Sequence, residues 1–214
     1  LEMGILTAAQ TLPYLLFSLF IGAWVDRLKR RPLLITADIG RGLLIFGIPI
    51  LTLSHALSIE ILILLAFIIN ILTVLADVAE EAYLPVLIGR EQLIEGHSKL
   101  SATSSAAEMV GPGLGGVLVQ WFSAPIAIAF DGISFLISGI LLLIIHTNES
   151  VPIREIKDEG IWSEVKEGFR FTMQHNILRP MIATALTLQL FGGMKNALLF
   201  LYVTNDLEFP PIFI

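Results

Sequence analysis

The residues best placed to do chemistry are the few ionisable side chains that interrupt long apolar stretches. Glu108 lies near the middle of one stretch, and Ser101, Ser104 and Ser105 precede it at nearly helical spacing, making one polar stripe. A charge in hydrocarbon is costly, so such a residue is a functional candidate by default. Two interpretations stay open: Glu108 takes up a proton or contacts a ligand, or it is a hydrogen-bonded structural acid.

Two further apolar stretches carry polar residues. Asn70, Thr73 and Asp77 stand at i, i+3 and i+7, which predicts one polar face of a helix. Lys195 lies beside Asn196 deep in the last stretch. There the lysine either binds an anionic or carbonyl-rich ligand or reaches the outer interface.

Patterns typical of enzymes and metal sites are missing from the sequence. There is no cysteine, which excludes disulfides and thiolate metal sites, and the four histidines fall in predicted loops or at the ends of apolar stretches. Nothing resembles a catalytic triad or a HExxH site, so we expect no enzyme, no cofactor and no metal. Asp38 and Arg41, three residues apart, are predicted to form a structural ion pair at a cytoplasmic helix end.

Apolar helices are the elements that must position these residues. The 214 residues are 55% hydrophobic and 15% charged, against roughly 25% charged in soluble domains. About 20 mostly apolar residues suffice to cross about 30 Å of hydrocarbon. The sequence therefore predicts an all-α membrane protein with six transmembrane helices, at 3–25, 33–53, 59–80, 100–122, 125–145 and 178–203.

Positive charge predicts the direction of these helices. Four of the 13 cations, Arg27, Lys29, Arg30 and Arg31, crowd into one turn, and basic connections alternate with connections that hold no Lys or Arg. The positive-inside rule then places the basic loops in the cytoplasm and the N-terminus outside. We expect a multi-pass protein of a cell membrane, the bacterial cytoplasmic membrane, with no nucleic-acid partner.

A long basic connection divides the chain. We predict one domain over 1–145, a cytoplasmic linker over 146–177, and the first helix of a second half over 178–214. Within the linker, apolar residues repeat near helical spacing at Trp162, Val165, Phe169 and Met173, which predicts an amphipathic helix.

Several motifs together resemble the major facilitator superfamily. Gly22, Asp26, Arg27, Arg30 and Arg31 resemble its cytoplasmic loop motif between the second and third helices. The run Gly111-Pro112-Gly113-Leu114-Gly115-Gly116 resembles the fifth-helix motif of its antiporter, drug-exporting members. Segments 76–79, 83–85, 90–93 and 98–100 are similar to the macrolide-efflux and enterobactin-exporter branch. Matched in order, the chain corresponds to family helices two to seven, a partial fold.

The resemblance implies a secondary active transporter that exports amphipathic small molecules, such as drugs, macrolides or siderophore-like compounds, by alternating access. Its expected partners are the small-molecule substrate, protons exchanged by antiport, the lipid bilayer and the missing helices of the full-length transporter. We expect the chain to be a fragment that does not transport alone. The alternative is a non-transporting membrane scaffold or a channel-like protein.

The resemblance also implies roles for the motif residues. The basic loop is expected to latch the two halves in the outward-open state, with Asp26 as its main residue, whereas Arg30 and Arg31 are explained equally well as topology signals. Glycines Gly22, Gly111, Gly115 and Gly116 are expected to allow close helix packing, and Pro112 to kink its helix. The family's fourth helix often carries an arginine linked to proton transfer, but 61–75 holds none.

Overall fold

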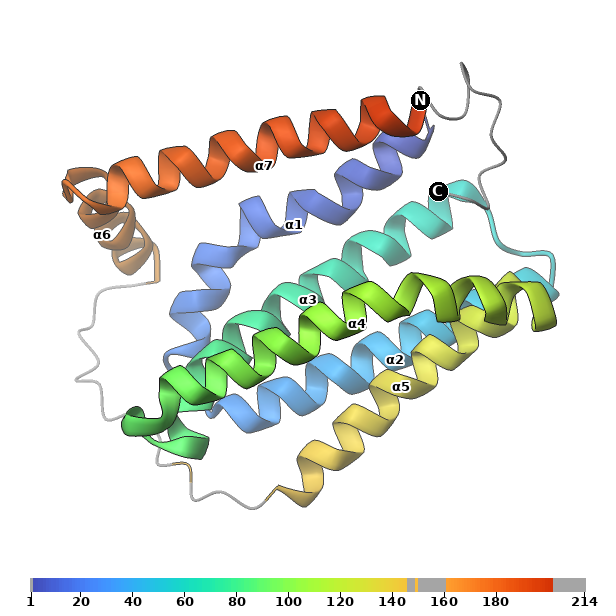
Figure 1. Ribbon diagram of the computed structural model, residues 1–214, viewed down its shortest axis with the longest axis horizontal. Coiled ribbons are helices and arrows are strands. Elements are labelled where there is room, and N and C mark those ends of the chain that lie inside the picture. The colour runs from blue at the N-terminus through green and yellow to red at the C-terminus, as the bar shows by residue number, and fades with distance from the viewer. Residues whose placement is uncertain (1, 146–148, 150–160, 202–214) are drawn as a thin grey trace. The chain divides into compact units, whose positions relative to one another are not determined.

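A computed structural model describes residues 2–145, 149 and 161–201 of the chain (Figure 1). Every regular element within these residues is helical, which confirms the all-α class. The chain divides into two compact units, Leu1–Ile161 and Trp162–Ile214, and each is described by itself.

The first unit holds five long helices. They are α1 (Glu2–Val25), α2 (Arg30–Leu53), α3 (Ile59–Ile88), α4 (Leu93–Phe122) and α5 (Ala124–Ile144), with a short 3₁₀ turn η1 (Arg90–Gln92) before α4. Helix α6 (Ile161–Gln174) begins at the boundary, and α7 (Leu178–Leu201) belongs to the second unit. The expected amphipathic helix is therefore present as α6, with Trp162 and Phe169 exposed on it.

Two predicted helix boundaries are wrong, because the helices extend past the apolar stretches that revealed them. Helix α3 continues from the expected end at 80 to Ile88, through Pro85, and Gly89 with φ of 74° ends it. Helix α4 begins at Leu93, seven residues before the expected start. Each is 30 residues long, or roughly 45 Å at 1.5 Å per residue, which exceeds the hydrocarbon thickness. Their polar turns therefore remain helical outside the span.

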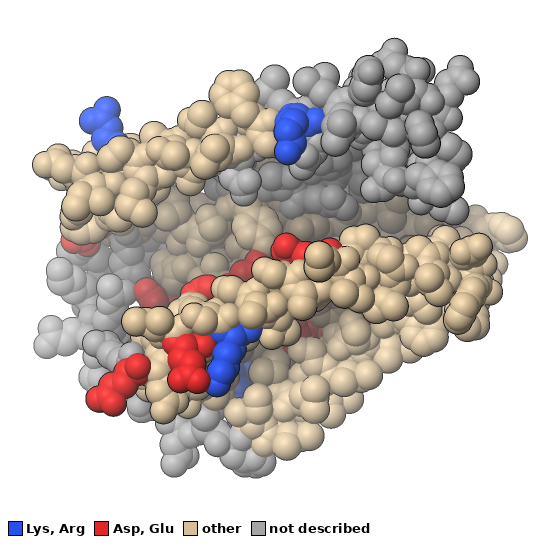
Figure 2. All heavy atoms as spheres, in the orientation of Figure 1, with Lys and Arg blue, Asp and Glu red and all other residues tan. Residues whose placement is uncertain are grey.

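Three described helices, α2, α3 and α5, are long and apolar enough to cross a membrane by length and composition. Within α1, Leu16–Val25 is a shorter apolar stretch. Figure 2 shows that most of the described surface on one face is uncharged, with charged side chains gathered at the end of α4 where that helix begins. This uncharged surface, which includes many exposed large hydrophobic side chains, agrees with a helical protein that is surrounded by lipid.

The core of the first unit lies where α1, α2 and α3 meet, and α5 packs on the other side of α2 (Figure 1). Aliphatic and small side chains fill this core, and Tyr83 is its largest fully buried side chain. Its buried members are Ile21, Val25, Leu34, Ala37, Val74, Leu75, Ala76, Ala79 and Tyr83.

Helices α2 and α5 make the most extensive helix pair, and glycines let their backbones approach closely. A Cβ atom on Gly132 of α5 would lie 3.1 Å from the backbone oxygen of Gly42 and 3.1 Å from the backbone nitrogen of Phe46, both on α2. Backbone atoms cannot move aside as the end of a flexible side chain can. The α2–α5 seam, as we call this contact, therefore favours glycine at that point, because a larger residue would force the two backbones apart by a few tenths of an ångström.

Candidate functional site

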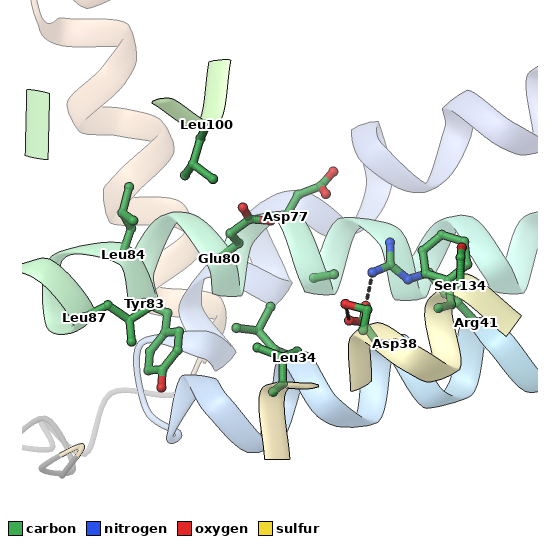
Figure 3. Close-up of a pocket in the computed structure, with 14 residues that line it drawn as sticks. Leu34, Asp38, Arg41, Asp77, Glu80, Tyr83, Leu84, Leu87, Leu100 and Ser134 are labelled. Atoms are coloured by element: carbon green, nitrogen blue, oxygen red, sulfur yellow. Dashed lines mark hydrogen bonds and ion pairs between the residues drawn. The ribbon is translucent and has the colours of Figure 1, made fainter. Parts of the chain in front are cut away.

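The described part of the first unit contains a pocket of about 430 Å³ between α2, α3 and α5 (Figure 3). Four charged residues line it: Asp38 and Arg41 from α2, and Asp77 and Glu80 from α3. Leucines from four helices and Phe135 supply the apolar walls, and Ser134 and Ser138 of α5 add hydroxyl groups. The remaining lining residues are Leu34, Ala76, Tyr83, Leu84, Leu87, Leu100 and Leu142.

Asp38 and Arg41 form the expected ion pair, and both are buried. One carboxylate oxygen of Asp38 accepts from Arg41 Nη2, and the other accepts from Ser138 Oγ at 2.6 Å. The Arg41 guanidinium lies 4.5 Å from the ring centroid of Phe135, within range of a cation–π contact. Its Nε, in contrast, has no hydrogen-bond partner among the described residues.

The pair lies deeper than the sequence suggested. Helix α2 begins at Arg30, so Asp38 and Arg41 follow eight and eleven residues later, or roughly 12 and 16 Å along the axis. Neither residue is at the helix end. A buried cation halfway along a spanning helix needs its partner close by, and the i, i+3 spacing provides it.

On α3, two residues of the predicted polar face bond to their own helix and the third lines the pocket. The Asn70 amide donates to the Ala66 carbonyl, and Thr73 donates to the carbonyl four residues before it, so both satisfy their own helix. Asp77 lines the pocket and accepts a hydrogen bond from the Tyr14 hydroxyl of α1. Glu80, one turn further on, lines the same pocket. Both acids are exposed in this structure.

The basic turn before α2 joins the ends of two helices. Both oxygens of Glu149 accept backbone N–H groups of α2, from Arg30 at 2.7 Å and from Arg31 at 3.2 Å. The Arg30 Nη1 also pairs with Glu149 at 3.5 Å. Arg31 donates from Nε to the Leu142 carbonyl at 3.1 Å and from Nη2 to the Leu143 carbonyl at 2.7 Å. An acid thus caps the N-terminus of α2 and a cation caps the C-terminus of α5.

The other motif residues of this turn lie at the end of α1. Asp26 is exposed there, and its backbone N–H donates to the Gly22 carbonyl at 3.1 Å. A Cβ atom on Gly22 would have nothing within 4 Å. Among the described residues, therefore, no helix approaches Gly22 closely enough to need a glycine.

The fifth-helix motif lies on α4, which has no buried residue. A Cβ atom on Gly111, Gly115 or Gly116 would likewise meet nothing within 4 Å among the described atoms. Pro112 is inside the helix, which continues through it to Phe122. Glu108 is exposed on the same helix and does not line the pocket.

The polar pair of the last helix is placed only in part. Lys195 is exposed on α7. The side chain of Asn196 lies outside the described residues. Their roles stay predictions, as do those of the other candidate residues.

Sequence reasoning missed three contributors to this geometry. Glu80 was placed at the last position of a predicted helix, although its i, i+3 spacing from Asp77 indicated a shared face. Ser138 lies one turn after Ser134 and gave a similar signal. Glu149 gave none, because its partners are 118 and 119 residues away.

Comparison with known proteins gives the chain a family. The family model described as transmembrane secretion effector matches residues 1–213. The multidrug efflux pump Tap of Mycolicibacterium fortuitum is 26% identical over 97% of this chain and 53% of its own length. Macrolide efflux protein A of Enterococcus faecalis is 26% identical over 91% of this chain and 60% of its own. The putative bacilysin exporter BacE of Bacillus subtilis (strain 168) is 27% identical, covering 84% and 44%.

The chain spans about half the length of these curated relatives. No solved structure matches it. The family match nevertheless covers nearly every residue, and the helical structure and apolar surface agree with it. The chain belongs to the transmembrane secretion effector family, a membrane transport family of the major facilitator superfamily.

Proposed function

We propose that the protein works as a secondary active exporter of amphipathic small molecules such as drugs or macrolides, driven by proton antiport. The observation that carries this proposal is the family match over residues 1–213, together with relatives named as an efflux pump, an efflux protein and an exporter. The substrate class and the outward direction of transport in this proposal both come from the names of these relatives.

Transport by alternating access needs two bundles that rock around a central site. This chain spans about half the length of its relatives, so we assign the activity to a transporter that contains this chain and a second half. The bundle of α1 to α5 is one of the two rocking bodies. The bacterial cytoplasmic membrane, with the basic turn inside, is the proposed location.

The contacts of the basic turn support a division of labour within its motif. Arg30 and Arg31 are engaged with Glu149 and with the end of α5, so they hold the bundle together at its cytoplasmic side. Asp26 and Arg27 lie one turn earlier, at the end of α1, and we assign the latch between halves to them. Asp26 is exposed, as a residue that meets another body must be.

Among the candidates for proton coupling, Asp77 has the strongest support, because it is a carboxylate that lines a pocket and bonds across helices to Tyr14. Glu108 remains the second candidate for the proton. We assign substrate contact to Lys195 and Asn196, which lie on a helix of the second half. Asn70 lies on the same helix face as Asp77.

An efflux assay on the full-length transporter tests the proposal. Cells that lack their own drug exporters are loaded with ethidium or a macrolide, and outward transport is followed with and without a protonophore. We expect export that the protonophore abolishes, and a large loss of export for Asp77→Asn and Asp26→Asn. Lys29→Gln is the matched control, because Lys29 is exposed and its side chain makes no cap to α2. Export that continues unchanged with the protonophore would exclude proton antiport.

A further inference from the structure

We propose that Tyr14 is a positioning residue for the proton step of export. Its hydroxyl group holds the Asp77 carboxylate while that carboxylate is ionised, and so sets how readily Asp77 takes up a proton. The inference rests on the proposed function, in which Asp77 is the leading candidate for proton coupling. It adds a residue on another helix that the sequence analysis did not single out.

The bond joins two helices through residues that are far apart in the sequence. The Tyr14 hydroxyl of α1 donates to Asp77 Oδ2 of α3, and 63 residues separate the two. Pro13, which is fully buried, precedes Tyr14 inside α1, and Figure 1 shows that α1 bends along its length. Proline removes one backbone hydrogen bond and is the usual cause of a helix kink. Pro13 therefore places the bend of α1 beside the residue that reaches α3.

Depth makes a donor to Asp77 necessary. Tyr14 lies near the middle of α1, 12 residues after Glu2 and 11 before Val25, or roughly 18 and 16 Å along the axis. A carboxylate at that depth of a membrane is costly unless a donor or a cation accompanies it. Tyr14 is the one hydrogen-bond donor to the Asp77 side chain in the part of the chain that the structure describes. The hydroxyl group therefore favours the ionised form of Asp77.

Other charges near Asp77 also act on its proton. Arg41 favours the ionised carboxylate, although its ion pair with Asp38 offsets part of this effect, and Glu80, one turn further along α3, opposes it. All of these groups belong to α2 or α3, and the residues of α4 and α5 that line the pocket carry no titratable group. Substitution of Tyr14 thus leaves every other titratable group of the pocket in place. The groups that line it with Asp77 are Asp38, Arg41, Glu80 and Tyr83.

The bond changes strength when Asp77 changes charge. A donor binds an ionised carboxylate about twice as strongly as it binds a neutral acceptor. Protonation of Asp77 therefore loosens α1 from α3 next to Pro13, and ionisation tightens the contact again. Both side chains are exposed, with Tyr14 at 40%, so a proton can reach the carboxylate without opening the core.

The pH profile of export by the full-length transporter in proteoliposomes tests this role. Ethidium transport is measured with the pH difference across the membrane held constant while both pH values are varied. We expect Tyr14→Phe to move the midpoint of the profile to higher pH, because a carboxylate without its donor takes up a proton more readily. A movement of about one pH unit corresponds to a tenfold change in proton affinity.

Ser18→Ala is the matched control. Ser18 lies one turn further along α1, and its side chain makes no hydrogen bond with the described residues, so this variant should keep the wild-type midpoint. A Tyr14→Phe transporter that folds but does not transport is titrated by infrared spectroscopy of the protonated carboxyl group, with Asp77→Asn as the blank. The infrared midpoint should move in the same direction and by the same amount.

An unmoved midpoint for Tyr14→Phe, or an equal movement for Ser18→Ala, overturns the role of Tyr14. The two measurements separate this result from failure of the proposed function. If a protonophore abolishes wild-type export but Tyr14→Phe keeps the wild-type midpoint, the exporter stands and the positioning role is wrong. If a protonophore leaves wild-type export unchanged while the infrared midpoint moves in Tyr14→Phe, proton antiport is wrong and Tyr14 still controls the proton on Asp77.

Discussion

The α2–α5 seam and helix α4 both contain glycines and an ion pair, but these are closely packed in the seam and exposed on α4. On the seam, Gly132 meets backbone atoms of α2, and the Asp38–Arg41 pair is buried. On α4, a Cβ atom added to Gly116 would meet nothing within 4 Å among the described atoms. The Glu95–Lys99 pair of α4 has side chains that are 68% and 76% exposed.

The difference teaches that residue type alone does not say what a residue does. The glycines of α4 belong to a recognisable family motif, whereas those of the seam belong to no motif that the sequence analysis identified. It is the seam glycine that a backbone presses against. The close packing that restricts residue size is therefore in the seam. Matched substitutions in the two regions should change the stability of the protein by very different amounts.

The largest effect is expected when the buried cation of the seam is removed. Arg41→Met leaves Asp38 buried with Ser138 as its remaining partner. Breaking a buried ion pair from one side typically costs about 3–5 kcal/mol. Thermal unfolding of the full-length transporter in micelles, followed by circular dichroism, measures the loss. The double variant Asp38→Asn with Arg41→Met should recover much of it, and no recovery would mean that Arg41 stabilises through packing alone.

A smaller loss is expected for an added methyl group in the seam. Gly132→Ala places a Cβ atom 3.1 Å from two backbone atoms of α2, and overpacking of this kind costs about 1–3 kcal/mol. Gly116→Ala is the matched control on α4, where the methyl group has space and alanine favours the helix. The same unfolding assay compares them. Equal losses from the two variants would remove the distinction between the seam and α4.

The end of the seam beside the basic turn should be sensitive to Glu149. Glu149→Ala removes the acceptor of two backbone N–H groups at the start of α2 and the ion pair with Arg30. Loss of a helix cap costs about 0.5–2 kcal/mol. Glu149→Gln, which keeps an acceptor oxygen, should lose less, and the ratio of the two unfolding shifts is the measurement. If the alanine variant unfolds like the wild type, the cap does not hold α2 to the end of α5.

The helices could be predicted from the sequence because apolar runs are local features. The ion pair of Asp38 with Arg41 was predictable for the same reason, since three residues separate them. Its depth was not, because α2 begins at Arg30, three residues before the expected start, and Glu149, which accepts its first N–H groups, is more than 100 residues away. Local spacing cannot reveal such a partner.

The pocket was predictable only in pieces. Asp77 was singled out from its spacing with Asn70 and Thr73, but those two residues bond to their own helix instead. Glu80 and Ser138 join Asp77 and Arg41 because α2, α3 and α5 pack in a particular order, and no periodicity within one helix contains that order. For the same reason, a motif glycine can be recognised without knowing what approaches it.

The smallest effect is expected from the exposed pair of α4, and it completes the comparison. Lys99 Nζ lies 2.7 Å from Glu95 Oε1, close enough for a strong contact in isolation. Exposed i, i+4 pairs contribute only about 0.3–0.5 kcal/mol, because water screens the charges and both side chains lose freedom. Lys99→Ala should therefore shift the unfolding midpoint slightly, and 1 M salt should reduce even that shift in the wild type. A loss as large as that of Arg41→Met would show that burial is not what separates the two ion pairs, and that α4 is covered by another body in the full-length transporter.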